Sequence, residues 1–129
     1  MVEPEKSQDT KMSSVLVDSH SPLVPLPVAK ILFLTLLKQF PNSTGYDLIQ
    51  KGTKFAKNKV IIKSGSIYPI LHEFEELHLV TSTQHEEGRK RRVYVLTEKG
   101  EKELLVLGAL LRFRMNLLIN PLLDIIENV

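Results

Sequence analysis

The chain has 129 residues, a formal net charge of +2 and 43% hydrophobic residues, which suits one soluble domain with a modest core. It contains no cysteine, which excludes disulfides, zinc–thiolate sites and cysteine nucleophiles. The N-terminal residues contain no apolar segment of the kind that directs secretion. The longest apolar run, Leu104 to Leu111, is far shorter than the roughly 20 residues of a membrane span. We therefore expect a cytoplasmic protein without a membrane partner.

The first part of the chain changes character near residue 26. Residues 1–25 mix Ser, Glu, Lys and Asp without steady periodicity, which is typical of a disordered or loosely ordered arm. From Pro27 to Phe40 the sequence is apolar nearly all round, and a helix of this kind is covered by several neighbours or by a second chain. Pro27 suits its first position, and Pro41 to Ser43 should end it.

A second helix is predicted from Thr44, because Asp47 follows three residues later and the two can form a capping box. We expect it to run to about Lys51, with Gly52 loosening its end. A basic connector should follow, from Lys54 to Lys63. The apolar residues of this connector should point inward; they are Phe55, Val60, Ile61 and Ile62.

A third helix is predicted in "SGSIYPILHEFEELHLV", which begins at Ser64, because its apolar residues recur with helical spacing. Pro69 lacks a backbone N–H, so it is harmless only in the first turn, and the helix should start near Gly65 or Ser66. The stripe that should face the core consists of Ile67, Ile70, Leu71, Phe74 and Leu77.

A β-hairpin and a long helix are predicted next. The strands should lie near Leu79 to Thr83 and Arg91 to Leu96, with "EEGRK" as the turn. Thr97 should cap a helix from Glu98 to Ile119 that carries apolar residues on more than one face. Asn120-Pro121 should interrupt it and leave a short amphipathic tail.

Three helices, a hairpin and a long helix, in this order, are the elements of a winged helix-turn-helix, which is an α+β and mainly α fold. More than half of the 17 Lys and Arg residues lie in two blocks that flank the third helix. These residues are Lys51, Lys54, Lys57, Lys59 and Lys63 before the helix, and Arg89, Lys90, Arg91 and Arg92 after it. Two such blocks around one helix match the electrostatic pattern of a protein that binds a phosphate backbone.

The segments "TGYDLIQ", "GSIYPILHEFEELHLV" and "EEGRKRRVYVLTEKGEKEL" resemble the PadR family of transcriptional regulators. The family motifs fall on Gly45-Tyr46, on Gly65 to Leu71, and on Tyr94 to Gly100, and the resemblance covers roughly Ile31 to Leu105. The single helix after the hairpin resembles the shorter branch of the family. The resemblance implies a homodimeric winged-helix repressor on a palindromic operator in double-stranded DNA, often relieved by a small molecule.

The expected organisation is an arm (1–25), a winged-helix DNA-binding domain (26–97), and a C-terminal dimerisation helix with its tail (98–129). In a winged helix, the start of the third helix reaches base edges, and small hydroxyls and free N–H groups there can bind phosphates. The predicted DNA-binding residues are Tyr46, Lys57, Lys59, Lys63, Ser64, Ser66, Tyr68, Pro69, His72, Arg89, Lys90, Arg91 and Arg92. For Tyr46 and Tyr68, packing in the core is an equally good interpretation.

The last helix has too many apolar positions for a single stripe, and soluble monomers rarely expose a large apolar patch. Two-fold pairing is the commonest way to bury one, so we expect a homodimer. The predicted dimerisation residues are Leu104, Leu107, Leu111, Phe113 and Leu118. A small apolar effector would bind near three of them, Leu107, Leu111 and Phe113; a rigid dimer without a ligand is the alternative.

One feature favours a different function. In the middle of the third helix, where PadR members usually carry a Lys or Arg, this chain has His72 and Glu73, and Glu75 and Glu76 follow. A winged helix that binds protein partners and no DNA is therefore the alternative function, and whether a DNA-binding form represses or activates stays open. The histidines show no metal-ligand spacing and no serine has a base nearby, so we expect no metal, no cofactor and no enzyme activity.

Overall fold

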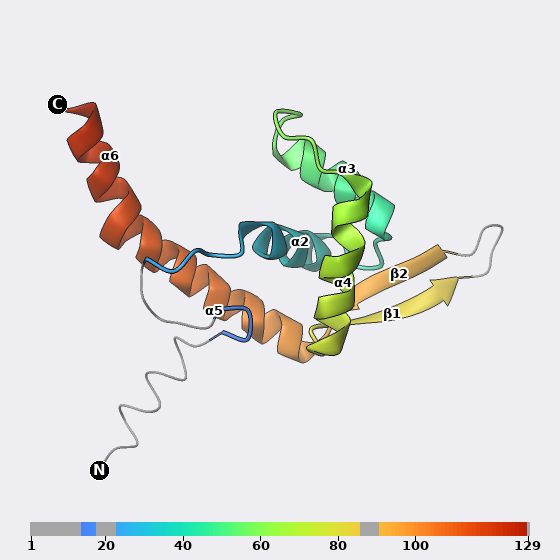
Figure 1. Cartoon of the computed structure of the whole chain (residues 1–129). Helices are drawn as coiled ribbons and strands as arrows, with labels where there is room; N and C mark the ends of the chain where they lie inside the picture. Colours follow the sequence, from blue (N-terminus) through green and yellow to red (C-terminus); the bar gives the residue numbers. More distant parts are fainter. Residues whose placement is uncertain (1–13, 18–22, 86–90, 129) are drawn as a thin grey trace, which may run out of the picture. The chain divides into compact units, whose positions relative to one another are not determined.

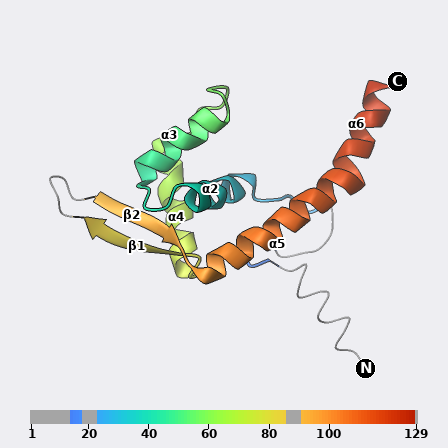
Figure 2. The same ribbon diagram turned by 180° about the vertical axis from the view of Figure 1, so that it is seen from behind.

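The computed structural model describes residues 14–17, 23–85 and 91–128. The chain divides into two compact units. One consists of residues 28–104, and the other combines the residues before 28 with residues 105–129. The elements of the first unit form the predicted winged helix-turn-helix, and they appear in Figures 1 and 2 as helices α2 to α4, the two-stranded hairpin and the start of α5.

Helix α2 (Val28–Gln39) lies at the centre of the first unit. It packs against α3 (Gly45–Phe55) and against the second strand of the hairpin, and Figure 1 shows it between them. Its apolar residues face several neighbours at once, as the all-round apolar sequence predicts. The buried ones are Ile31, Phe33, Leu34, Leu36 and Leu37.

Helix α3 begins with the predicted capping box. The Asp47 N–H donates to the Thr44 hydroxyl oxygen, and the Thr44 N–H donates to the Asp47 carboxylate, both at 3.0 Å. The helix continues past the predicted end to Phe55, because Gly52 lies within it and provides space instead of ending it. A Cβ atom on Gly52 would lie 2.7 Å from Cδ1 of Ile62, so the glycine allows the connector to pack on α3.

A 3₁₀ turn, η1 (Ser64–Ser66), leads into α4 (Ile67–Glu76). Pro69 is the third residue of α4, where no helical hydrogen bond needs its missing N–H, as predicted. The core-facing stripe is buried at Ile67, Leu71 and Phe74. An ion pair of 2.6 Å between Lys30 Nζ and Glu73 Oε1 joins α4 to α2.

The hairpin consists of β1 (Val80–His85) and β2 (Arg91–Leu96), paired antiparallel with Val80 opposite Leu96. Ser43 pairs with Tyr94 of β2: the Tyr94 N–H donates to the Ser43 carbonyl oxygen at 2.9 Å. This bridge fixes the start of α3 beside β2. The turn predicted at 86–90 lies outside the described residues.

Helix α5 (Glu98–Arg114) is capped as predicted, because the Gly100 N–H donates to the Thr97 hydroxyl oxygen at 2.9 Å. The predicted interruption at Asn120-Pro121 is wrong. A π-helical turn, η2 (Met115–Ile119), continues directly into α6 (Asn120–Glu127). The Asn120 N–H donates to the Met115 carbonyl oxygen, five residues back. Pro121 follows directly after the π-helical turn and has no N–H to donate to the preceding turn.

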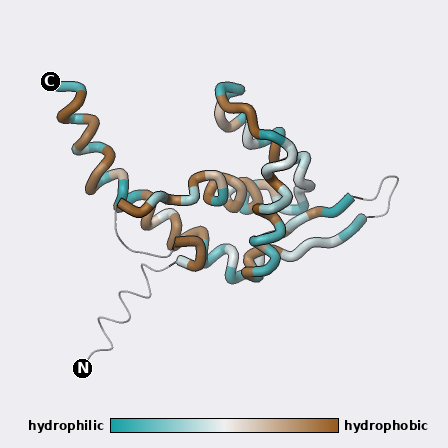
Figure 3. Tube along the Cα trace, in the orientation of Figure 1, coloured by the Kyte–Doolittle hydropathy of each residue, from teal (hydrophilic) through white to brown (hydrophobic). Residues whose placement is uncertain are grey.

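The continuous helix from Glu98 to Glu127 has 30 residues, and by length and composition it is long and apolar enough to cross a membrane. The longest uninterrupted apolar run in the sequence underestimates the length of this apolar helix, because isolated polar residues do not end it. Figure 3 shows hydrophobic residues on its successive turns. The exposed ones are Leu105, Leu111, Phe113, Met115, Leu117, Leu122, Leu123, Ile125 and Ile126.

Candidate nucleic-acid interface

A polar hollow of about 740 Å³ lies where the start of α3, the start of α4 and strand β2 meet. Its lining residues are Thr44, Gly45, Tyr46, Asp47, Tyr68, Arg91, Arg92 and Tyr94. Gly45 lets the two helices approach here, since a Cβ atom on it would lie 3.1 Å from the Tyr68 ring. The hollow therefore combines a helix start, two guanidinium groups and three phenol rings.

Arg92 is held on the sheet by its neighbours. Its Nη1 donates to the Ser82 hydroxyl oxygen at 2.8 Å, and its Nη2 lies 3.4 Å from Oε1 of Gln84. The Ser82 hydroxyl in turn donates to the Glu75 carboxylate at 2.8 Å. This chain of hydrogen bonds orients the guanidinium at the edge of the hollow, and a guanidinium has enough donors to bind a further anion.

The Tyr94 phenol is buried, and this burial raises its pKa above the usual value of 10.0. The nearby Glu75 carboxylate raises the Tyr94 pKa further, Arg92 lowers it, and Tyr68 raises it. The ring therefore stays neutral near physiological pH.

Most residues at the start of α4 and in the turn before it are exposed. Lys63, Ser64, Ser66, Tyr68 and Pro69 are all open to solvent. The Ser66 hydroxyl donates to the Lys63 carbonyl oxygen at 2.7 Å, so its proton is already used and its oxygen can only accept a hydrogen bond from a ligand. A helix start of this kind presents backbone N–H groups that have no partner inside the helix.

The predicted DNA-binding residues fall into three groups. Those that line the hollow are Tyr46, Tyr68, Arg91 and Arg92. Those that lie exposed along the connector and the start of α4 are Lys57, Lys59, Lys63, Ser64, Ser66 and Pro69. His72 lies apart from the hollow, with its Nε2 3.6 Å from Glu76, and both Arg89 and Lys90 lie outside the described residues.

The acidic half of α4 makes contacts within the chain. Glu73 pairs with Lys30 of α2, and Glu75 accepts the hydrogen bond from Ser82 of β1. Two of the three acidic residues thus join α4 to its neighbours in the fold. By contrast, the exposed lysines 54, 57, 59 and 63 form no ion pair within the described part of the chain.

Sequence reasoning missed Tyr94 and Ser82 as parts of this site. The signal for Tyr94 was present, because Arg92 and Tyr94 are two residues apart on a strand and therefore lie on the same face. Ser82 is paired with Tyr94 across the hairpin, which requires knowledge of the strand register. A strand sequence alone does not fix that register when its turn has no defining motif.

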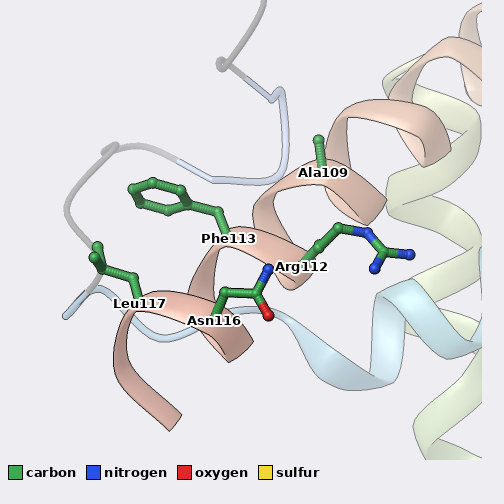
Figure 4. A pocket seen from close by; sticks show the side chains of 5 residues that line it. All are labelled: Ala109, Arg112, Phe113, Asn116 and Leu117. Carbon is green, nitrogen blue, oxygen red and sulfur yellow. The ribbon is translucent and has the colours of Figure 1, made fainter. Parts of the chain in front are cut away.

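The predicted dimerisation residues differ in exposure. Leu107 is completely buried in the single chain, Leu104 and Leu118 are partly exposed, and Leu111 and Phe113 are exposed. A shallow concavity of about 470 Å³ lies on the same helix and is lined by Ala109, Arg112, Phe113, Asn116 and Leu117. Figure 4 shows these side chains on successive turns, with Phe113 and Leu117 pointing to the same side.

The three-helix core and the hairpin beside it place the chain in the winged helix-turn-helix class of proteins. Within that class, the model of the "Transcriptional regulator PadR-like family" matches residues 33–105, more than half of the chain. The chain therefore belongs to the PadR-like family of transcriptional regulators. A comparison with curated proteins gives no match.

Solved structures agree with this assignment. Bacillus subtilis PadR in complex with operator DNA is 26% identical, with a TM-score of 0.56 over 63% of this chain, and this chain covers only 46% of it. The PadR-like regulator from Bacillus cereus is 28% identical, with a TM-score of 0.60 over 74% of this chain and 91% of its own. The PadR-like transcription factor from Bacteroides fragilis is 26% identical, with a TM-score of 0.62 over 92% of this chain and 98% of its own.

Proposed function

We propose that this chain is a cytoplasmic repressor that binds a palindromic operator as a homodimer. Residues 26–97 would bind the DNA, and residues 98–129 would pair the two copies. The observation that carries the proposal is the hollow beside the start of α4, where Arg91 and Arg92 lie next to Tyr46 and Tyr68. A phosphate fits this chemistry, because guanidinium groups bind it through two N–H groups and phenols add hydrogen bonds.

The unpaired lysines extend this surface along the connector to the start of α4. Lys57, Lys59 and Lys63 would contact the DNA backbone and fix the position of α4 in the major groove. Base edges would then be read by Ser64, Ser66 and Tyr68, which are exposed on the first turns. The complex of Bacillus subtilis PadR with operator DNA supports DNA binding by this fold.

Salt dependence tests this proposal. The double variant Arg91→Gln/Arg92→Gln should bind every DNA sequence more weakly, and the slope of log K against log salt should fall by about 1.8, since each lost phosphate contact removes about 0.9. A matched control is Lys99→Gln/Lys102→Gln, which removes the same charge from exposed positions on α5. If both variants change the slope equally, Arg91 and Arg92 do not contact the backbone.

The homodimer is supported by the apolar surface of the C-terminal helix. The concavity formed by Ala109, Arg112, Phe113, Asn116 and Leu117 has the spacing i, i+3, i+4, i+7 and i+8 along one helix. Such spacing is that of a hole that accepts a side chain from a second helix. A second copy of the chain would also place two α4 helices about one helical turn, roughly 34 Å, apart on a palindrome.

A membrane is the other way to cover this helix, because the helix meets the length and composition of a span. We favour a second copy because the PadR-like family consists of transcriptional regulators. Sedimentation in buffer without detergent separates the two: a stable dimer supports pairing, whereas a protein that needs detergent to stay in solution supports the membrane. Two paired concavities would also give a small apolar effector a site from which it could change the angle between the copies.

The alternative function, a winged helix that binds only protein partners, is supported by the acidic second half of α4. Against this alternative, Glu73 and Glu75 are engaged in contacts within the fold, so they do not neutralise the lysines near the start of α4. Retention of the purified protein on immobilised non-specific DNA at low salt, with release at high salt, supports DNA binding. Absence of retention at low salt supports the protein-partner function.

A further inference from the structure

The end of α3 and the connector that follows it expose three of the four apolar residues that the sequence places inside. Phe55 is 68% exposed, Val60 55% and Ile61 87%, which makes Ile61 the most exposed large hydrophobic side chain among the described residues. The expectation that they point inward is wrong for all three. Because Ile61 lies so exposed next to the proposed DNA-binding surface, we ask which group of a binding partner would cover it.

Ile61 is exposed because its neighbour Ile62 takes the inward position. Ile62 packs on α3 against Gly52, where a Cβ atom would lie only 2.7 Å away. Lys63 has an extended backbone, with φ −73° and ψ 137°. Ile61 and Lys63 are both exposed, whereas Ile62 between them is partly buried.

The surroundings of Ile61 are strongly basic. Lys54, Lys57, Lys59 and Lys63 are all exposed, and the sequence has no Asp or Glu between Lys51 and His72. A partner that covers Ile61 must therefore offer an apolar group closely surrounded by negative charge. In double-stranded DNA, the C5 methyl group of thymine is such a group, because it lies in the major groove between two phosphate backbones.

We propose that Ile61 contacts the C5 methyl group of a thymine in each half-site of the operator and so contributes to sequence specificity. The inference rests on the proposed function. Ile61 lies only three residues before Ser64, where the first turn at the start of α4 begins, and the residues at that end of a recognition helix reach base edges. Lys59 and Lys63 on either side would bind phosphates and hold the connector against the groove.

The experiment uses the full chain and an operator selected from random DNA by the purified protein. Each thymine of a half-site is replaced in turn by deoxyuridine, which keeps every hydrogen-bonding group and loses only the methyl group. At one position of the half-site, replacement of thymine by deoxyuridine should weaken binding of the unmodified protein about fourfold per methyl group, because burial of one such group contributes about 0.8 kcal/mol. The Ile61→Ala variant should bind the thymine operator more weakly than the unmodified protein. Replacement of the same thymine by deoxyuridine should change the affinity of this variant by less than twofold.

Two control variants make the result specific. Val60→Ala shortens a neighbouring exposed apolar side chain and should keep the full response to deoxyuridine at that position. Lys63→Gln should flatten the salt dependence and also keep that response. The double comparison of protein and DNA variants thus measures the contact between one side chain and one methyl group.

Several outcomes would overturn the inference. It is wrong if no thymine of the half-site responds to deoxyuridine, if the selected half-site contains no thymine, or if Ile61→Ala keeps the full response. A change in sedimentation of Ile61→Ala with unchanged DNA binding would assign the residue to a contact between copies of the chain. Failure of the unmodified protein to bind any DNA would instead overturn the proposed function, and this inference with it.

Discussion

Gly100 and Leu79 approach so closely that a methyl group on Gly100 would overlap the Leu79 carbonyl oxygen and lie 3.0 Å from its carbonyl carbon. The same carbonyl oxygen accepts a hydrogen bond from the Thr97 N–H at 3.0 Å. The first turn of α5 is thus packed directly on the backbone between α4 and β1. Only glycine permits this approach, because the neighbouring atoms belong to the main chain and cannot move aside.

We expect Gly100→Ala to lower the free energy of unfolding by about 2–3 kcal/mol, as overpacking in a tight core does. Gly108→Ala is the matched control, since a Cβ atom at that helical position meets nothing within 4 Å. The control should be neutral or stabilising, because alanine is the better helix former by about 1 kcal/mol. Urea unfolding of both variants checks the prediction, and equal stability of the two would contradict it.

The hydrogen bond from Arg92 to Ser82 leads to a prediction about DNA binding. Ser82→Ala should weaken binding about two- to fivefold, because the exposed guanidinium loses a hydrogen bond that orients it, at a cost of about 0.5–1 kcal/mol. The slope of log K against log salt should stay unchanged, since no charge is lost. Thr83→Ala, on the neighbouring exposed position, should leave binding unchanged. A fall in slope for Ser82→Ala would show that its effect is not one of orientation.

Burial of Tyr94 predicts a loss of stability at alkaline pH. Because its pKa is raised in the folded chain, folding favours the protonated phenol. The contribution to stability is complete below pH 10.0, the usual value, and is lost as the pH rises through the folded-state pKa. Tyr94→Phe should therefore lose less stability between pH 9 and pH 12 than the unmodified chain, measured by urea unfolding. Tyr46→Phe, at an exposed position, should keep the original pH dependence.

Charged substitutions on the C-terminal helix test the proposed dimer. Phe113→Glu/Leu117→Glu places two carboxylates in the concavity and should convert a dimer to a monomer in sedimentation, with loss of palindrome binding. Lys99→Glu, an acidic change on the exposed start of α5, should leave the dimer intact. Leu107 does not serve for this test, because it is buried in the single chain, and a charged group there would destabilise the fold itself. Monomers that bind a full palindrome with unchanged affinity would contradict the coupling of pairing to DNA binding.

Local sequence signals predicted the elements of the winged helix well. The capping box at Thr44, the position of Pro69 and the extent of β2 follow from short-range chemistry, and the structure agrees with each of them. These signals are reliable because a cap or a missing N–H acts within one turn of a helix.

The errors concern features that depend on distant parts of the chain. Gly52 was interpreted as a helix end, whereas it makes room for Ile62, which lies ten residues later. The exposure of Ile61 follows from that same packing. The partners of Arg92 depend on strand register, and the burial of Leu107 depends on its neighbours in the fold, so neither can be obtained from periodicity alone.

The π-helical turn at Met115–Ile119 changes the direction in which the side chains after it point. Such a turn holds one residue more than the hydrogen-bonded loop of an α-helix, so it rotates everything after it by about 100° relative to a regular helix. The exposed leucines and isoleucines of α6 owe their direction to that extra residue. Loss of a single codon within this turn would leave the composition of the helix almost unchanged, yet it would turn the whole face of α6 away from any partner fitted to it.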